Sequence, residues 1–378
     1  MIDSFSAYQL SDICTRLSSG KSIHSSKVSE AGPYPVIGGN GYRGFTQEPN
    51  FVGECAVIGR QGAACGNVRY FSGKAYMTEH AVVAQTNPSH NTRYLAYLLS
   101  TMELGRLSAQ SAQPGLSVKT LGKQEVSLPS KETQDRIVAL LGALDDAIES
   151  NAKLNDYLAE LLDAQYGRLI AESSESALLI DIVRILSGGT PKTKNSEYWE
   201  GGSIPFFAPG DVTNSIYTLV TEKHITESGL NNCNSALYPV DTVFLTARGT
   251  VGKVAMAGRP MAMNQSCFAF AGIKVPQTVV FQVIKGAVRS LKAKANGATF
   301  AAINTRDLKD EEVSILSSER MAIYDRWAKP LHEMVRSNEE ESLRLAALRD
   351  ALLPKLMSGE IDVSKVDIAQ LNNHLAEN

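Results

Sequence analysis

The segment from Glu132 to Ile170 contains neither a proline nor a run of turn residues, and it is predicted to form one long helix. Counting from Ile137, its heptad a and d positions are Ile137, Leu140, Leu144, Ala147, Asn151, Leu154, Leu158, Leu161 and Gln165. A mostly apolar seam of this spacing is typical of a helix in a coiled coil. At about 1.5 Å per residue this helix is roughly 55 to 60 Å long, more than one compact domain needs.

A second seam of the same kind lies near the C-terminus, at an offset of 187 positions. The residues predicted to pair the helices are Leu144, Asn151, Leu158 and Leu161, and at the same offset Leu331, Asn338, Leu345 and Leu348. An asparagine at an a position penalises slipped registers, so the matched asparagines favour pairing of the two helices. The alternative is that each helix only covers its own domain. Pro330 predicts a kink or restart in the second helix, and Pro354 with Gly359 predicts its end.

The segments that precede the two helices also repeat each other. Residues 57–68 align with 243–254, 76–84 with 262–270, and 117–128 with 304–315. Each copy begins with a predicted short helix, continues with glycine-punctuated strands and one longer helix, and ends at its heptad segment. The second copy holds about 18 extra residues, between Gly189 and Gly249.

These patterns predict an α+β fold with an internal pseudo-twofold repeat. Two tandem mixed α/β domains are separated by two long, paired spacer helices. The predicted parts are a first domain, a central helix, a second domain, a C-terminal helix and a flexible tail, at residues 1–130, 131–172, 173–316, 317–362 and 363–378.

Charge divides the chain in the same way. The net charge is +3 for residues 1–130, −5 for 131–172, +6 for 187–306 and −6 for 307–378. Basic domains beside acidic helices favour a polyanionic partner on the domains and a protein partner on the helices. No apolar window is long enough to span a membrane and no basic-then-apolar leader is present, so we expect a cytoplasmic protein without a membrane partner.

Signatures of catalysis and metal binding are missing from the sequence. The five cysteines form no CxxC pair and the six histidines no HExxH or HxH, so we expect reduced thiols and no metal site. The segment GTVGKV at 249–254 is too short for a phosphate-binding loop. No Pro-Pro pair of the amino-methyltransferase type and no GxSxG is present. We therefore expect a non-catalytic binding protein with no catalytic residue and no cofactor in this chain.

The two domains place base-reading and phosphate-contacting residue types on glycine-flanked turns. Arginine and lysine hydrogen-bond guanine, and asparagine and glutamine hydrogen-bond adenine, in the major groove. The candidate DNA-binding residues are Arg43, Arg60, Gln61, Asn67 and Arg69 in the first domain, and Lys192, Lys194, Thr246, Arg248, Lys253, Asn264 and Gln265 in the second. Solvated turn residues of no function are the alternative at each position.

Several motifs resemble the specificity (S) subunits of type I restriction-modification systems. They are GGTPKTKNSEYWEGGSIPFFAPGDV at 188–212, TARGTVGKVAM with MNQSCFAF, ETQDRIVALLGALDDAIESN and LRDALLPKLMSGEI. The first domain departs from the pattern, with GKSIHSSK where the second has its Gly-Thr-Pro segment.

The resemblance implies two target-recognition domains that each read half of a bipartite site in double-stranded DNA. It implies two methyltransferase subunits on the helices, which carry S-adenosylmethionine and methylate adenine N6. Restriction subunits that use ATP and Mg are further implied partners. The alternatives are a coiled-coil adaptor whose two β-rich domains do not bind DNA, and a stand-alone methyltransferase or nuclease.

Overall fold

The computed structural model describes residues 5–108, 115–294, 302–367 and 370, and it divides into two compact units. Unit 1 comprises residues 1–147 and 345–378, and unit 2 comprises residues 148–344. Both boundaries between the units fall inside long helices. Each unit therefore contains one domain body together with a part of each helix.

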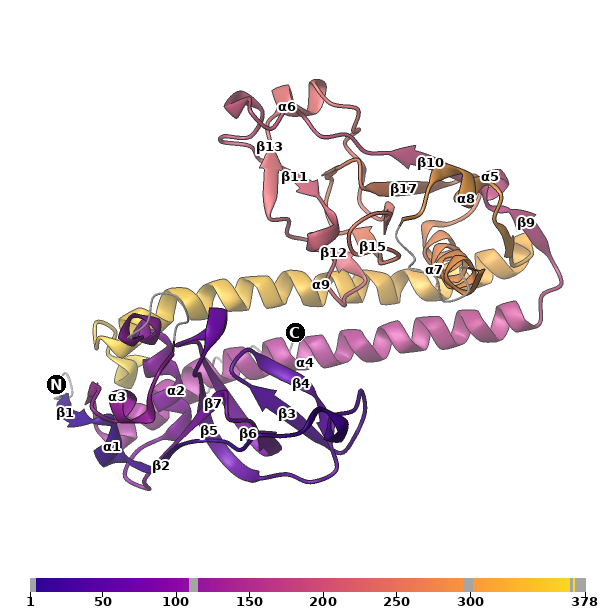
Figure 1. Cartoon of the computed structure of the whole chain (residues 1–378). Coiled ribbons are helices and arrows are strands. Elements are labelled where there is room, and N and C mark those ends of the chain that lie inside the picture. Colours follow the sequence, from indigo (N-terminus) through magenta and orange to yellow (C-terminus); the bar gives the residue numbers. More distant parts are fainter. Residues whose placement is uncertain (1–4, 109–114, 295–301, 368–369, 371–378) are drawn as a thin grey trace. The chain divides into compact units, whose positions relative to one another are not determined.

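The two long helices are α4 (Lys131–Ala171) and α9 (Ser318–Met357), which Figure 1 shows as unbroken coils. The predicted helix over Glu132–Ile170 is confirmed. The predicted restart at Pro330 is wrong, because α9 continues through this exposed residue. Its missing backbone donor faces solvent, where the loss of one hydrogen bond is tolerated. Pro354 also lies within α9, which ends three residues later.

Unit 1 is built on a six-stranded sheet with the order β2-β7-β5-β6-β3-β4. Its strands are β2 (Cys14–Ser19), β3 (Tyr34–Gly38), β4 (Gly41–Thr46), β5 (Phe51–Gly59), β6 (Val68–Met77) and β7 (Ala81–Thr86). A separate pair joins β1 (Ser6–Gln9) to β8 (Glu125–Leu128). The helices are α1 (Leu10–Ile13), α2 (Thr92–Ser100) and α3 (Val118–Gly122), with 3-10 turns η1 (Ser25–Lys27), η2 (Gly62–Ala64), η3 (Leu104–Leu107) and η6 (Val363–Lys365). The buried face of α2 shares its hydrophobic core with β5, β7 and α4.

Unit 2 repeats this plan with a sheet of the order β10-β17-β14-β15-β12 and a smaller one of the order β13-β11-β16. The strands are β10 (Val183–Ser187), β11 (Ile204–Phe207), β12 (Tyr217–Thr218), β13 (Lys223–Ile225), β14 (Val243–Thr246), β15 (Val254–Ala257), β16 (Ala262–Met263) and β17 (Cys267–Gly272). The pair β9 (Ser176–Leu178) and β18 (Glu312–Ser314) corresponds to β1 and β8. The helices are α5 (Leu179–Ile182), α6 (Glu227–Asn231), α7 (Gln277–Lys294) and α8 (Thr305–Lys309), with 3-10 turns η4 (Ser196–Tyr198) and η5 (Pro209–Asp211).

Equivalent strand registers confirm the internal repeat. The parallel pair β3–β6 sets Val36 opposite Tyr76, and the parallel pair β11–β16 sets Phe206 opposite Ala262. Most of the extra residues of the second copy lie between β11 and β14, where they form η5, β12, β13 and α6. The two bodies therefore share one frame and differ in the loops that it carries.

The short helices predicted at the start of each copy are wrong beyond their first turn. The helix α1 ends at Ile13, and residues 14–19 continue as the strand β2. The same change occurs after α5, where β10 follows. Pairing of β2 with β7 and of β10 with β17 outweighs the weak helix preference of these residues.

In unit 2 the two long helices pair antiparallel through buried amides. Asn338 Nδ2 donates to Asn155 Oδ1 at 2.8 Å, and Asn155 Nδ2 donates to the Val335 carbonyl at 3.2 Å. Asn151 Nδ2 donates to Glu341 Oε2 at 2.9 Å. Pairing through matched asparagines is confirmed, because a slipped register would leave these amides buried without partners.

The predicted seam is right at most of its a positions and at the d position Leu140, which is buried, but it is wrong at later d positions. Leu144 and Leu158 are buried and Leu331 and Leu345 are partly buried, but Leu161 and Leu348 are 49% and 45% exposed. The buried side chains of α4 are Gln134, Ile137, Leu140, Leu141, Leu144, Asn155, Leu158, Leu162 and Tyr166. After Ile137 the residues three and four positions later are both buried, whereas after Leu158 only the residue four positions later, Leu162, is buried.

The predicted flexible tail over 363–378 is partly wrong. Residues 363–365 form η6, and Val363 is buried in the unit 1 core. Arg136 Nη2 on α4 donates to the Val363 and Ser364 carbonyls at 3.3 and 3.2 Å, which ties this turn to the helix. Residues 368, 369 and 371–378 of the tail lie outside the described residues.

Candidate nucleic-acid interface

In unit 2, three loop segments meet at the ends of the strands. They are residues 188–194 after β10, residues 247–253 between β14 and β15, and residues 264–266 before β17. Ala247 N and Arg248 N donate to the Ser266 carbonyl at 2.8 and 3.2 Å. Gly189 N donates to the Met263 carbonyl at 3.0 Å, and the Thr190 hydroxyl donates to Gln265 Oε1. The segments therefore form one hydrogen-bonded surface, which we call the unit 2 loop rim.

The close approach within this rim requires glycine at position 188. A Cβ on Gly188 would lie 2.1 Å from the carbonyl oxygen of Asn264, well inside contact distance. Gly20 has the same role in unit 1, where a Cβ would lie 2.1 Å from the Met77 carbonyl oxygen. Any other residue would separate the first loop from the rim in both units.

The unit 2 loop rim carries cations and amides that are free to bind a ligand. Lys192, Lys194, Arg248 and Gln265 are exposed, and Lys253 is half-buried. Within the described part of unit 2, the side chains of these four cations make no ion pair. Unpaired cations on a rigid frame suit contacts to base edges and phosphates.

Two of the predicted residues hold the rim together. Thr246 is buried, its hydroxyl donates to the Thr250 carbonyl, and it accepts a hydrogen bond from Lys253 N at 2.9 Å. The prediction that Thr246 contacts DNA is therefore wrong, since a fully enclosed hydroxyl in the turn cannot reach a ligand. Asn264 Oδ1 accepts from Ser266 N at 2.9 Å and shapes the third segment.

Unit 1 builds an equivalent rim with the same backbone hydrogen bonds. Arg60 N donates to the His80 carbonyl at 2.9 Å, as Ala247 N does to Ser266. Lys21 N donates to the Met77 carbonyl at 2.9 Å, as Gly189 N does to Met263. We call residues 20–24, 60–67 and 78–80, with the turn between β3 and β4, the unit 1 loop rim.

The side chains on the unit 1 loop rim are of two kinds. Gln61 and Asn67 of the rim are exposed, and so are two predicted residues on the strands outside it, Arg43 on β4 and Arg69 on β6. Arg69 Nη1 donates to the Asn40 carbonyl at 3.2 Å. Arg60 is half-buried and donates from Nε to the Leu116 carbonyl at 3.3 Å, so its guanidinium also closes the loop.

Sequence reasoning missed two rim residues. Thr190 holds Gln265, and His80 Nδ1 lies 3.0 Å from Gln61 Oε1. The alignment of residues 76–84 with 262–270 placed His80 beside Ser266 and was sufficient to include it. No motif marked Thr190 as a rim residue rather than a turn residue.

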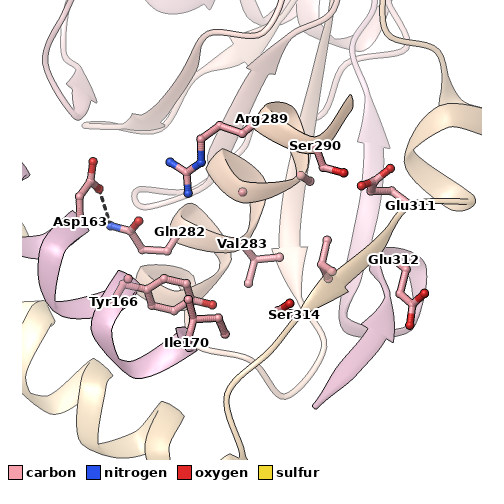
Figure 2. A pocket seen from close by; sticks show the side chains of 14 residues that line it. Asp163, Tyr166, Ile170, Gln282, Val283, Arg289, Ser290, Glu311, Glu312 and Ser314 are labelled. Atoms are coloured by element: carbon pink, nitrogen blue, oxygen red, sulfur yellow. Dashed lines mark hydrogen bonds between the residues drawn. The ribbon is translucent and has the colours of Figure 1, made fainter. Parts of the chain in front are cut away.

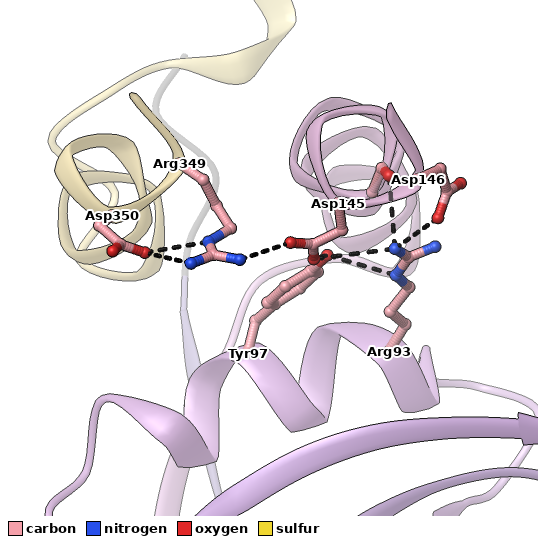
Figure 3. A network of polar contacts seen from close by, with 7 residues as sticks. Arg93, Tyr97, Asp145, Asp146, Arg349 and Asp350 are labelled. Atoms are coloured by element: carbon pink, nitrogen blue, oxygen red, sulfur yellow. Dashed lines mark hydrogen bonds and ion pairs between the residues drawn. The ribbon is translucent and has the colours of Figure 1, made fainter. Parts of the chain in front are cut away.

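A charged network fastens the unit 1 body to the helices. Figure 3 shows Asp145 of α4 between Arg349 of α9 and Arg93 of α2. Arg349 Nη1 donates to Asp145 Oδ1 at 2.8 Å, and the Tyr97 hydroxyl donates to Oδ2. Arg93 Nη2 pairs with Asp146 at 2.8 Å. The network joins three helices within unit 1 through mutually compensating charges.

Unit 2 also contains a cavity of about 320 Å³ between α4, α7 and β18 (Figure 2). Asp163 in its wall accepts from Gln282 Nε2 at 2.9 Å and pairs with Lys285 at 2.5 Å. Glu311 pairs with Lys294 at 2.7 Å. These two carboxylates therefore already have cationic partners, and Arg289 lines the same cavity.

The described residues contain no cluster of histidine, cysteine, aspartate or glutamate that could hold a metal ion. Cys55 and Cys267 are buried thiols, and burial raises the pKa of each to about 12. Among the same residues, no helix has the length and apolar character needed to cross a bilayer.

The class of protein follows from this arrangement and from comparison with known families. A model of the type I restriction modification DNA specificity domain matches residues 3–160 and again residues 172–320. The two matches cover most of the chain and coincide with the two copies of the repeat. The chain therefore belongs to the family of type I restriction-modification specificity subunits and has two specificity domains.

Individual relatives agree with this assignment. The chain is 44% identical over 117 residues to the type I restriction enzyme EcoprrI specificity subunit of Escherichia coli, which covers 31% of this chain and 29% of that protein. It is 26% identical over 274 residues to the HindI specificity subunit of Haemophilus influenzae, which covers 68% and 58%. The two alignments thus span 29% and 58% of the relatives' own lengths.

A solved structure has the same fold. The type I restriction-modification S subunit from M. genitalium superposes with a TM-score of 0.63 at 16% identity, over 94% of this chain and 96% of that one.

Proposed function

We propose that this chain supplies the DNA sequence specificity of a type I restriction-modification complex. Each loop rim would read one half of a bipartite site in double-stranded DNA. The observation that supports this most strongly is the pair of rims, which share backbone hydrogen bonds but differ in side chains: Gln61 and His80 in unit 1 correspond to Arg248 and Ser266 in unit 2. One frame with two sets of side chains suits two different half-sites.

The helices are the proposed docking place of the other subunits. We propose that two methyltransferase subunits bind them, carry S-adenosylmethionine and methylate adenine N6, while this chain performs no chemistry. Restriction subunits would bring ATP and Mg. The strongly acidic helical segments support a protein partner there, since they repel DNA. As the target is cellular DNA, the cytoplasm is the expected compartment.

We further propose that α4 and α9 set the spacing between the two half-sites. Both helices are continuous, and both carry the amide pairs that fix one register in unit 2. Insertion of one full heptad into both helices should lengthen the gap and leave each half-site unchanged. An unchanged gap would contradict this part of the proposal. A non-DNA adaptor finds no support in the family match.

A DNA-binding titration tests the proposal as a whole. The chain is combined with the proposed methyltransferase subunits, and affinity is measured between 50 and 200 mM salt on random duplexes and on a duplex that carries the two-part motif mapped from methylated host DNA. Specific binding should exceed random binding by at least about a thousandfold, and both should weaken with salt. Equal affinity for every duplex at all salt concentrations would contradict the proposal.

A further inference from the structure

A second cavity in unit 2, about 310 Å³ in volume, lies between α7 and the turn that joins β14 to β15. Its polar lining comes from Asn214, Ser215, Lys285, Arg289 and Lys292, and no carboxylate lines it. It shares Arg289 with the cavity beside Glu311, whose lining, unlike this one, also includes carboxylates.

Two of the three cations in this cavity are available to a ligand. Lys285, Arg289 and Lys292 lie on one face of α7, at spacings of four and three residues. Lys285 is paired with Asp163 at 2.5 Å. Arg289 and Lys292 have no hydrogen bond or ion pair to another described side chain, and Figure 2 draws none from Arg289 to Asp163 or Gln282. Both side chains are exposed, and Arg289 also lines the cavity beside Glu311. Two cations without an ion pair to a described side chain thus line this cavity.

A hydroxyl donor completes the site. The Ser215 Oγ atom is buried and has no hydrogen-bond partner among the described residues. A buried polar atom without a partner is costly, so its presence at a cavity wall points to a ligand atom that accepts a hydrogen bond.

Gly252 lets Lys292 approach the turn between β14 and β15, which belongs to the unit 2 loop rim. A Cβ at Gly252 would lie 2.7 Å from Lys292 Cε and 3.0 Å from Lys292 Nζ. Glycine therefore lets the ammonium group lie directly against the turn that carries Arg248 and Lys253. A ligand bound here would lie next to the unit 2 loop rim.

The simpler explanation is that cations at the end of α7 complement the helix dipole. It accounts for Lys292 and Lys294, which lie in the last turn. It does not account for Arg289, one turn earlier, or for the unpartnered hydroxyl of Ser215.

We propose that this cavity binds one backbone phosphate of the DNA, next to the half-site read by the unit 2 loop rim. Phosphate oxygens accept hydrogen bonds from guanidinium, ammonium and hydroxyl groups, which are the three donors present. The inference rests on the proposed DNA-reading function and adds a contact that positions the duplex without reading its sequence.

The test uses the double variant R289Q/K292Q in the full chain, combined with its methyltransferase subunits. Loss of one phosphate contact should reduce the slope of log affinity against log salt by about 1 and should weaken binding about tenfold at low salt. The loss should be equal on specific and random duplexes, and the recognised sequence should not change. The control K309Q/R326Q removes the same charges from exposed positions outside the cavity and should retain the full slope.

Each outcome separates the two proposals. A wild-type chain without salt-dependent DNA binding would contradict the proposed function itself. If wild type binds DNA and R289Q/K292Q keeps its slope, or changes the recognised bases, the phosphate site is wrong. Calorimetry with inorganic phosphate distinguishes the source: millimolar binding lost in R289Q/K292Q, together with an unchanged DNA slope, would assign the cavity to free phosphate and overturn the proposal.

Discussion

The two units fasten their bodies to the long helices at equivalent positions with opposite chemistry. Asp145 in α4 and His332 in α9 are related by the 187-residue offset of the repeat. Asp145 is the centre of a charged network, whereas His332 is 2% exposed and packs edge-on against Tyr217 and Phe281. The comparison shows that one joint can be made either from compensated charges or from buried neutral groups.

The neutral joint has its own electrostatic signature. Burial lowers the pKa of His332 to about 4 from its usual 6.5. Burial also raises the pKa of Glu339, two turns further along α9, to about 8 from 4.5. Both groups are therefore uncharged in the folded protein near pH 6. The stability of unit 1 should therefore fall when a charge of its joint is removed, and the stability of unit 2 should depend on pH.

The largest expected effect is that of Asp145→Ala. It leaves Arg349 and the Tyr97 hydroxyl without their shared partner, and breaking such a partly buried network costs about 3 kcal/mol. Hydrogen exchange should show faster opening in unit 1. Both tryptophans, Trp199 and Trp327, lie in unit 2, so their fluorescence transition should change little.

Asp350→Ala is the matched control for this network. The Asp350 side chain is 65% exposed and, among the described residues, pairs only with Arg349, so its loss should cost less than about 1 kcal/mol. Equal destabilisation by the two variants would show that Asp145 is not the centre of the joint.

The next effect concerns the stability of unit 2 as a function of pH. Between pH 4.5 and 8, folded Glu339 keeps a proton that the unfolded chain releases, so its contribution is complete below pH 4.5 and is lost as pH rises through 8. Glu339→Gln should therefore stabilise unit 2 by about 2 kcal/mol at pH 8 and very little at pH 5. Denaturant titration followed by tryptophan fluorescence measures both values.

His332 has the opposite sign. Its unfolded form takes up a proton as pH falls below 6.5, so stability decreases between pH 6.5 and 4, and His332→Phe should remove that decrease. The carboxylates of Asp241, Asp325 and Asp163 raise the pKa of this ring and should moderate the change, whereas Lys285 lowers the pKa further. Glu333→Gln removes a carboxylate from an exposed position of α9 and is the control for both pH predictions. If the stability of Glu339→Gln depended on pH in the same way as that of wild type, the buried neutral joint would be refuted.

A smaller effect is expected in the amide pairs of unit 2. Asn155→Leu removes the partner of Asn338 Nδ2 and should cost about 1 kcal/mol, because one buried amide donor is left unpaired. The double variant with Asn338→Leu should recover most of that loss and lose its unique register. A double-mutant cycle in denaturant measures the coupling, and simple additivity would contradict a role for the amide pair.

The fold was largely predictable from the sequence, because heptads and aligned repeats extend over many residues and tolerate local errors. The assignment of single residues to the helix seam was not predictable in this way. Leu140 and Leu141 are both buried, so the heptad count allowed a d position one residue early, and Leu161 was taken for Leu162. The end of a four-residue helix such as α1 is set by the pairing of the strand that follows it, and no local sequence pattern reveals that pairing.

The candidate site was less predictable than the fold. The sequence indicated the turns that form the two rims but could not separate exposed side chains from buried ones, since Thr246 and Arg248 are two residues apart and have opposite environments. Burial and hydrogen-bond direction distinguish them. The charged network around Asp145 joins helices far apart in the chain, so spacing within one segment could not predict it.

The most direct test of the account is to map methylated adenines in the DNA of a host that carries this chain with its methyltransferase subunits. Wild type should give one two-part motif. Arg248→Gln should relax one half only, by about 1 to 3 kcal/mol in half-site preference, and Gln61→Ala should affect the other. The absence of a two-part motif, or a change in both halves from either substitution, would contradict recognition by two independent rims.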